Sequence, residues 1–338
     1  MRSVLVMGLG SSGQRFVRIL RKLYGESLQI YVLRRGKNNI LISSDLQSAF
    51  PIDPCVHYKL TEIENLAQLK GIFLDLIIIS SISSAHFQDI ELISEMGFKN
   101  ILVEKPLLLP KNLEQSAQVV LELLNQHGCA SGYFTRLHPL AQKLKSLIDN
   151  GSLGRPLVYR SWYGEKIEEM HPYEDHTKSY AANELMGGGP LNTFSHDLDL
   201  LYYLFDEVSD FKFDEYRSNW SKIQSQEIQT LQASGEVYGY RFLIQASFDF
   251  VTWPKSRGGE MVFELGTIRW NWQELSIKAL SIETGLETYD FSSVDFSILI
   301  EEAIRQLMDN SYNPEVLEAC WRDFVRVGVI LSQYNEIR

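Results

Sequence analysis

The spacing Gly8-x-Gly10-x-x-Gly13 constrains the fold of this chain more than any other feature. It follows an apolar run at residues 3–7 and precedes an amphipathic helical pattern at residues 14–24. In a strand–turn–helix, the first glycine permits the tight turn and the second lets a phosphate approach the backbone. The third lets helix and strand pack closely. We therefore predict a dinucleotide site that includes Gly8, Gly10, Ser11, Ser12 and Gly13, the alternative being a plain glycine turn.

The first third of the chain repeats this alternation of strand and helix. Apolar runs at residues 28–33, 75–80 and 101–103 predict further strands, and the pattern predicts helices at residues 62–70, 87–96 and 112–126. Solidly apolar strands that alternate with helices indicate a parallel sheet covered on both faces. We predict a doubly wound Rossmann domain over residues 1–127.

After Gly128 the pattern changes. Residues 238–250 alternate between an apolar and a polar face, and residues 268–272 repeat the alternation, which is typical of half-buried strands. Helical patterns follow at residues 296–308 and 314–334. With 338 residues, about two domains are expected. We predict a second α/β domain over residues 128–338 with a mainly antiparallel sheet.

Composition excludes several classes of function. The net charge of −11 argues against nucleic acid as the main partner. Three separated cysteines with no CxxC pair indicate neither a disulfide framework nor a zinc site, and we expect no metal. No apolar stretch reaches the length of a membrane span, and no signal sequence is evident. We expect no membrane association and a cytoplasmic location.

The residues at the end of the second predicted strand indicate whether the cofactor is NAD or NADP. An NAD enzyme would place a carboxylate there to hold the ribose 2′-hydroxyl, whereas this chain has Arg34 and Arg35. Guanidinium groups suit a phosphate, so we predict NADP over NAD, with NAD possible. The alternative is a pair of solvated surface arginines. Ser81 and His86 follow the third strand, at the edge of the sheet where ligands bind.

Glu104-Lys105-Pro106 directly follows the strand predicted at residues 101–103. A lysine at the end of a buried strand needs a partner or a use, because burying an ammonium group is costly. His196 follows Gly187-Gly188-Gly189 in the second half of the chain. We predict Lys105 and His196 as the catalytic pair, with Glu104 and Lys105 beside the nicotinamide. His196 suits proton transfer at neutral pH. The alternatives are a surface lysine and a packing histidine.

These segments resemble the Gfo/Idh/MocA family (glucose–fructose oxidoreductase and inositol dehydrogenase relatives). The resemblance rests on GLGSSG, VEKP, GYFTRLHP at residues 132–139, Gly154-Arg155-Pro156 and GGGPLNTFSHDLD at residues 187–199. It implies a Rossmann domain joined to an α/β domain with an open, mainly antiparallel sheet. It also implies a homodimer or homotetramer formed through that sheet. The substrate implied is a carbinol or carbonyl of a sugar, and residues 171–180 resemble a subgroup that acts on amino-sugars or nucleotide-sugars.

By this resemblance, Lys105 and His196 occupy the family's catalytic positions, but the chain departs from the pattern at one point. The family's aspartate before the histidine is replaced by Asn192 and Thr193. Asp175, Asp197 and Asp199 are candidates to replace that carboxylate. The residues expected to contact the substrate are Tyr133, Arg136, Asp175, Asn192, Thr193 and Asp199. For Tyr133 and Arg136, core packing and an interdomain ion pair are equally compatible with the sequence.

We expect an NAD(P)-dependent oxidoreductase acting on CH–OH groups. The alternative is a non-catalytic dinucleotide-binding sensor, which the missing aspartate would permit.

Overall fold

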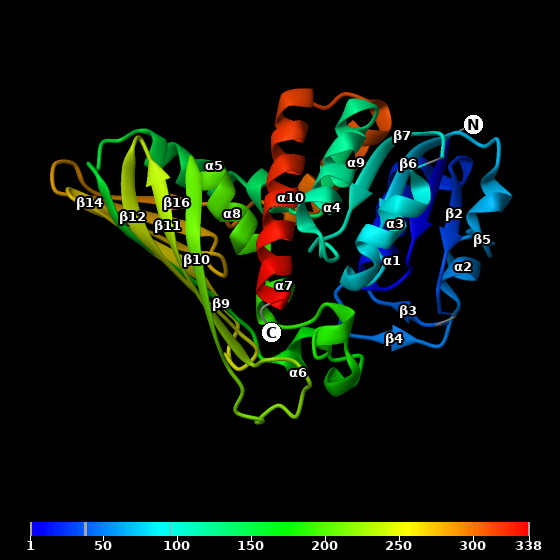
Figure 1. The fold of residues 1–338 in the computed structure, drawn as a ribbon, viewed down its shortest axis with the longest axis horizontal. Helices are drawn as coiled ribbons and strands as arrows, with labels where there is room; N and C mark the ends of the chain where they lie inside the picture. Colours follow the sequence, from blue (N-terminus) through cyan, green and yellow to red (C-terminus); the bar gives the residue numbers. More distant parts are fainter. Residues whose placement is uncertain (1, 37–38, 95, 337–338) are drawn as a thin grey trace.

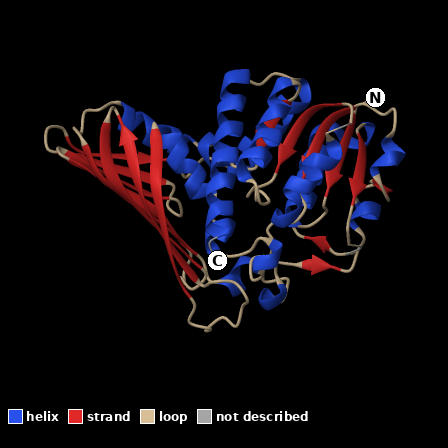
Figure 2. Cartoon of the chain, viewed as in Figure 1, coloured by secondary structure: helices blue, strands red, loops and turns tan. Residues whose placement is uncertain are grey.

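The computed structural model describes residues 2–36, 39–94 and 96–336. In these ranges the chain forms two large sheets and one short hairpin (Figures 1 and 2). The first sheet is parallel, in the order β5-β2-β1-β6-β7-β8. Its strands are β1 (Ser3–Met7), β2 (Gln29–Leu33), β5 (Thr61–Ile63), β6 (Leu74–Ile79), β7 (Phe98–Val103) and β8 (Gly128–Ser131).

Helices cover both faces of the parallel sheet, as its buried strands require. On one face, α1 (Ser11–Tyr24) packs against α9 (Phe296–Asp309), so the C-terminal part of the chain returns to the first sheet. The other helices of this half are α2 (Pro54–His57), α3 (His86–Ile93) and α4 (Leu113–Glu122). The Rossmann expectation is confirmed. The domain division at residue 128 stays a prediction, and β8 begins there.

The second sheet has eight strands in the order β10-β11-β12-β9-β13-β14-β15-β16. Every pairing is antiparallel except that of β9 with β12. Its strands are β9 (Pro156–Gly164), β10 (Glu207–Tyr216), β11 (Ile228–Val237), β12 (Tyr240–Asp249), β13 (Ser256–Phe263), β14 (Gly266–Asn271), β15 (Ser276–Ser281) and β16 (Gly285–Asp290). The mainly antiparallel second sheet is therefore also confirmed.

One face of the second sheet is buried by α5 (Pro139–Asp149) and α8 (His196–Leu204). The long helix α10 (Pro314–Glu336) stands between the two sheets and contacts β8, α4 and α8 (Figure 1). One apolar cluster therefore runs from the parallel sheet through Trp321 and Phe324 of α10 to the second sheet, and another lies between the parallel sheet, α1 and α9. Short elements complete the fold: β3 (Leu41–Ile42), β4 (Ala49–Phe50), α6 (Ile167–Met170) and α7 (Pro190–Thr193).

Two local expectations are wrong. The helix expected at residues 62–70 is instead β5 followed by a 3-10 turn, Leu66–Leu69. The side chain of Asn65 accepts a bond from the Ala67 N–H and caps that turn, and the Gln68 side chain accepts a bond from the Asn65 N–H. The helix expected at residues 112–126 ends at Glu122 and continues as a 3-10 turn, Leu123–Asn125.

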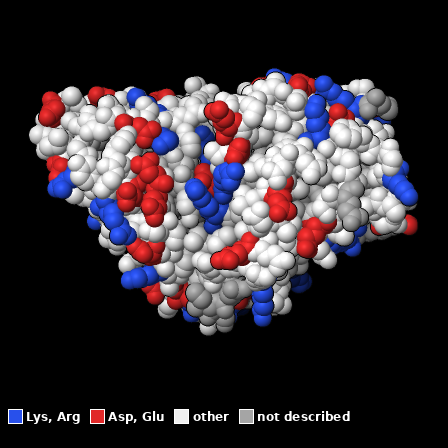
Figure 3. Space-filling view, turned by 45° about the horizontal axis from the view of Figure 1, so that its top comes forward, with Lys and Arg blue, Asp and Glu red and all other residues white. Residues whose placement is uncertain are grey.

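Charges are spread over the surface (Figure 3). On the face shown, acidic and basic side chains alternate, with a basic group near the middle flanked by acidic side chains. Within the described residues, no helix is both long enough and apolar enough to cross a membrane.

Candidate functional site

A cavity of about 510 Å³ lies along the carboxyl ends of β1, β2 and β6. Its walls include the loop after β1, the loop after β6, Glu104 and Lys105 after β7, and four residues of the segment 171–180. The carboxyl edge of a parallel sheet is where ligands of such folds bind. The volume is in the usual range for a small-molecule site.

The glycine loop has the shape that a diphosphate needs. A Cβ atom on Gly8 would lie 2.6 Å from the Ser80 carbonyl oxygen, and one on Gly13 would lie 2.2 Å from the Gly8 carbonyl oxygen. These two glycines therefore permit close packing. A Cβ on Gly10 would meet nothing within 4 Å, although Gly10 lines the cavity. The second glycine thus keeps open the space that a phosphate would fill.

Helix α1 begins at this loop with Ser11, which lines the cavity together with Ser12. Its first turn holds no acidic residue, and no side chain caps its backbone N–H groups. Free N–H groups and the positive end of the helix dipole favour an anion. The residues present therefore fit the diphosphate of a dinucleotide.

The two arginines after β2 have different partners. Arg34 donates to Glu62 at 3.0 and 2.6 Å and to Asp53 at 3.4 Å, and its side chain is 4% exposed. Arg35 pairs with the buried Asp89 of α3, and half of its side chain is exposed. Asp89 also accepts a bond of 2.5 Å from the Ser81 hydroxyl. Both arginines line the cavity, but only Arg35 retains an exposed guanidinium side chain there.

His86 is buried and is not one of the residues that line the cavity. Its ring nitrogens contact the carbonyl oxygens of Pro106 at 2.9 Å and Ser81 at 3.0 Å. The ring therefore joins the loop after β6 to the loop after β7. Burial lowers the pKa of His86, although both carbonyl contacts oppose that change.

Glu104 and Lys105 form the opposite end of the cavity. The Glu104 carboxylate pairs with Arg15 of α1 at 2.5 Å. Lys105 Nζ donates a bond of 2.5 Å to the Thr193 carbonyl oxygen, across the two halves of the molecule. Burial lowers the pKa of Lys105 to about 8, with Glu104 opposing the effect and Arg15 and Arg257 adding to it.

His196 opens α8 on the far side of Thr193 and does not line the cavity. Its Nδ1 atom is buried without a hydrogen-bond partner, and the Tyr133 ring meets it edge-on with centroids 5.7 Å apart. Burial lowers the pKa of His196 well below its usual value, and the nearby charges of Lys105 and Arg257 add to this. The imidazole is therefore neutral at pH 7.

Asn192 and Thr193 are buried on α7, at the place where the family resemblance expects a carboxylate. The Asn192 side-chain nitrogen Nδ2 donates to the Gly188 carbonyl oxygen at 3.1 Å. The side-chain oxygen Oδ1 of Asn192 is buried without a hydrogen-bond partner. Asp175 is exposed and bonds to Thr177 and Lys178 in a turn. Asp175 therefore does not supply the missing carboxylate to the cavity lining.

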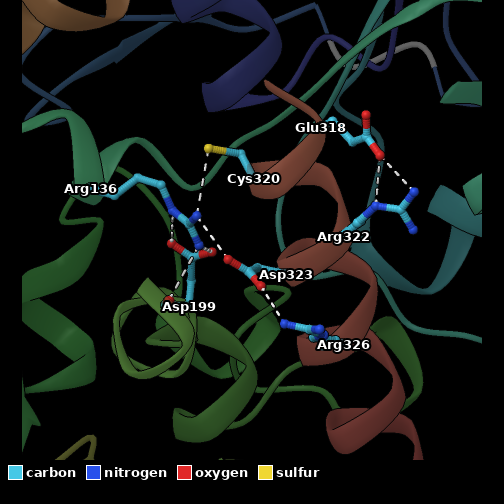
Figure 4. Close-up of polar contacts among 7 residues, drawn as sticks. All are labelled: Arg136, Asp199, Glu318, Cys320, Arg322, Asp323 and Arg326. Carbon is cyan, nitrogen blue, oxygen red and sulfur yellow. Dashed lines mark hydrogen bonds and ion pairs between the residues drawn. The ribbon is translucent and has the colours of Figure 1, made fainter. Parts of the chain in front are cut away.

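Arg136 and Asp199 form a buried ionic junction with α10 (Figure 4). Arg136 bonds to both carboxylate oxygens of Asp199 and to Asp323 at 3.0 Å. Of the sequence candidates for substrate contact, none lines the cavity: Tyr133, Arg136, Asp175, Asn192, Thr193 and Asp199. Thr193 is joined to the lining residue Lys105, whose Nζ donates to the Thr193 carbonyl oxygen.

Four cavity residues from the segment 171–180 are absent from the sequence-based set of lining residues: His171, Tyr173, Glu174 and Tyr180. Their position just before the triple glycine is the signal that the sequence offers for them, whereas Asp175, the residue of this segment predicted to contact the substrate, does not line the cavity. Asp89 is a further lining residue that was not predicted, because a buried carboxylate on a short helix leaves no pattern in the sequence.

The fold and this site define an α/β protein with a parallel Rossmann sheet, a second, mainly antiparallel sheet and a cavity at the edge of the first. Residues 141–238 match the model of the GFO/IDH/MocA C-terminal domain. The chain is 30% identical over 133 residues to scyllo-inositol 2-dehydrogenase (NAD(+)) of Bacillus subtilis, covering 39% of this chain and 35% of that protein. It is 28% identical over 176 residues to D-xylose 1-dehydrogenase [NADP(+)] of Haloarcula marismortui, covering 48% and 47%.

The matched segments span between about a third and half of these curated relatives. The structural likeness covers more of the chain than these sequence matches do. Levoglucosan dehydrogenase, solved in complex with NADH and levoglucosan, superposes with a TM-score of 0.72 at 12% identity. That superposition covers 99% of this chain and 96% of the other. The match to the GFO/IDH/MocA model is therefore one of residues 141–238, and the likeness to levoglucosan dehydrogenase is one of fold.

Proposed function

We propose that this protein is an NAD(P)-dependent oxidoreductase that transfers a hydride to or from a sugar-type substrate. The observation that carries the proposal is the single cavity that joins an open glycine loop at Gly10 to a buried lysine at Lys105. A dinucleotide laid along this cavity would have its diphosphate at the start of α1 and its nicotinamide near Lys105. When bound, that ring supplies or accepts the hydride.

Lys105 is suited to orient a substrate oxygen. Its ammonium group is fixed by the bond to the Thr193 carbonyl oxygen, and it lies at the cavity wall with donor hydrogens to spare. A positioned donor beside a reacting oxygen stabilises the charge that develops there. The relatives named for inositol and xylose support a substrate with CH–OH groups, and an amino-sugar or nucleotide-sugar is within this class.

The proposal is tested by following the nicotinamide absorbance with a panel of sugars, amino-sugars and nucleotide-sugars. Lys105→Ala should lower turnover by about 100-fold or more, because it removes an electrostatic contact to the reacting oxygen. Its unfolding midpoint should stay close to that of the wild type. Lys111→Ala, which changes an exposed lysine, is the matched control. Equal turnover in wild type and Lys105→Ala would contradict the proposal.

A non-catalytic sensor is the second candidate, and the replacement of the family's aspartate by Asn192 and Thr193 favours it. Such a protein would bind cofactor but show no turnover with any member of the panel. Activity that appears only in Thr193→Asp would establish this second reading.

A further inference from the structure

One wall of the cavity comes from the second half of the chain. It consists of the lining residues that belong to the segment after α6, namely His171, Tyr173, Glu174 and Tyr180. The segment is attached to the second sheet, because the Ile167 N–H of α6 donates to the carbonyl oxygen of Phe250, the residue after β12, at 3.1 Å. The loops after β1 and β6 form other walls of the same cavity. A ligand that fills the cavity therefore contacts both halves of the molecule.

The three carboxylates that line the cavity differ in their partners. Asp89 is paired with Arg35, and Glu104 is paired with Arg15 at 2.5 Å. Among the residues that the structure describes, the Glu174 carboxylate has no arginine or lysine partner and pairs with a histidine. A carboxylate without a permanent cation beside it repels a phosphate group and accepts hydrogen bonds from hydroxyl groups. The wall that carries Glu174 therefore suits a hydroxyl-bearing part of the ligand.

His171 and Glu174 form a pair within a single turn of the backbone. His171 Nδ1 lies 3.0 Å from Glu174 Oε1, and the Glu174 N–H donates to the His171 carbonyl oxygen at 3.1 Å. The Tyr173 ring lies against the imidazole, with ring centroids 5.3 Å apart and an angle of 32° between the planes. The side chains of His171 and Glu174 are 18% and 35% exposed. Both therefore keep surface that a ligand in the cavity can contact.

The contact with Glu174 determines which nitrogen of a neutral His171 carries the proton. A carboxylate oxygen only accepts, so the proton is on Nδ1, which donates to Oε1. The lone pair of Nε2 is then an acceptor, and Glu174 Oε2 is a second acceptor. Within the described part of the chain, neither of these two atoms has a hydrogen bond to the protein. Two neighbouring acceptors of this kind are complementary to two neighbouring hydroxyl groups.

We propose that His171 and Glu174 bind a vicinal diol of the ligand, with His171 Nε2 and the Glu174 carboxylate accepting its two O–H groups. The inference rests on the function proposed above, which supplies two sources of such a diol. One source is a ribose of the dinucleotide, and the other is the ring of a sugar substrate. The inference gives the role in ligand binding to Glu174 and not to Asp175, which does not line the cavity.

The test compares wild type with Glu174→Gln, which removes the charge and replaces one acceptor oxygen by a donor. NADH and NADPH are titrated by fluorescence without substrate, and the protein–NADH complex is then titrated with the panel of sugars. The diol-bearing ligand should bind about 10–100-fold more weakly to the variant, with the unfolding midpoint unchanged. Glu169→Gln on α6 is the matched control, because Glu169 is exposed, carries the same charge and does not line the cavity.

The two sources of the diol give different results. If a cofactor ribose supplies it, the dissociation constant of NADH should rise by about 10–100-fold in Glu174→Gln. If the sugar supplies it, NADH should bind within about 2-fold of wild type, and the sugar should show the weakening instead. His171→Asn keeps a donor towards Glu174 but removes Nε2, and it should weaken the same ligand by about 5–10-fold.

Unchanged affinities for cofactor and sugar in both Glu174→Gln and His171→Asn would overturn the inference. If no sugar of the panel binds the wild type, an unchanged NADH affinity in the two variants would overturn it as well. In either case, cofactor binding by the wild type would leave the proposed function standing. Failure of the wild type to bind NADH and NADPH would overturn the proposed function and this inference together.

Discussion

At the scale of single residues, Arg35 and Asp89 form an ion pair in the lining of the cavity, close to the end of β2. Arg34 is held by Glu62 and Asp53, so Arg35 is the arginine with an exposed side chain at the cavity. If a 2′-phosphate binds there, Arg35→Ala should weaken NADPH binding by about 10–100-fold, the worth of one charge-assisted bond, and NADH binding by less than about 3-fold. Fluorescence titration of both reduced cofactors measures this.

The control for this titration is Arg241→Ala, which breaks an exposed ion pair with Asp210 on the second sheet. Equal weakening of NADPH and NADH binding would mean that Arg35 shapes the cavity but does not contact the 2′-phosphate. The opposite preference would point to Asp89, whose carboxylate can accept a bond from a ribose 2′-hydroxyl as NAD enzymes use.

The same residues show which parts of the site can be predicted from the sequence. The arginines were evident because they directly follow a strand, and the glycine spacing was evident because its reason is local. Asp89 and Tyr180 were not, because they reach the cavity through tertiary packing of a short helix and an irregular segment. Arg34 and Arg35 looked alike in sequence, and only their partners in the fold separate them.

At the scale of elements, Glu227, the residue before β11, fixes the loop that joins β10 to β11. Its carboxylate accepts bonds from the backbone N–H groups of Ser218 and Ser221 at 2.6 and 2.7 Å, and from both hydroxyl groups. Burial alone would raise the pKa of Glu227, but these four bonds outweigh it and lower the pKa to about 2. Charged Glu227 therefore stabilises the folded state above the pKa of the unfolded chain.

Glu227→Gln should lower the free energy of unfolding by about 2–3 kcal/mol at pH 7, because the amide replaces an acceptor oxygen by a donor facing N–H groups. The deficit should shrink as pH falls from about 4.5 towards 2, where wild-type Glu227 also loses its charge. Urea unfolding across this range measures it, with exposed Glu283→Gln as control. A deficit that is constant with pH would contradict the ionic account.

Some helices and strands can be predicted from the sequence, and others cannot. Strands buried on both faces, such as β6, are continuous apolar runs and were predicted within one residue of their ends. Strand β10 was missed because its polar and exposed positions give little alternation. Residues 62–70 were misassigned because β5 is only three residues long and pairs with β2 through tertiary structure.

At the scale of the whole molecule, the Arg136 junction links the 3-10 turn Phe134–Leu137, α8 and α10 (Figure 4). Removing one partner of a buried ion pair typically costs about 3–5 kcal/mol. Arg136→Met should lower the stability of the protein by that amount, since Asp199 and Asp323 would be left facing each other. Thermal unfolding measures it, and Arg136→Met/Asp199→Asn should recover part of the loss.

Arg322→Ala is the comparison for this junction, because it breaks an exposed pair with Glu318 on the same helix and should cost less than about 1 kcal/mol. Turnover per folded molecule should change little in Arg136→Met. A large loss of turnover with unchanged stability would instead assign Arg136 to the substrate.

The most direct test of the central claim, that the cavity binds a nicotinamide dinucleotide, is a fluorescence titration of wild type and Gly10→Val with NADPH and NADH. A Cβ at Gly10 meets no protein atom within 4 Å, so the variant should fold normally while its side chain fills the phosphate position. We predict saturable binding by the wild type and weakening by about 100-fold or more in Gly10→Val. Equal binding by the two proteins, or none by the wild type, would contradict the account.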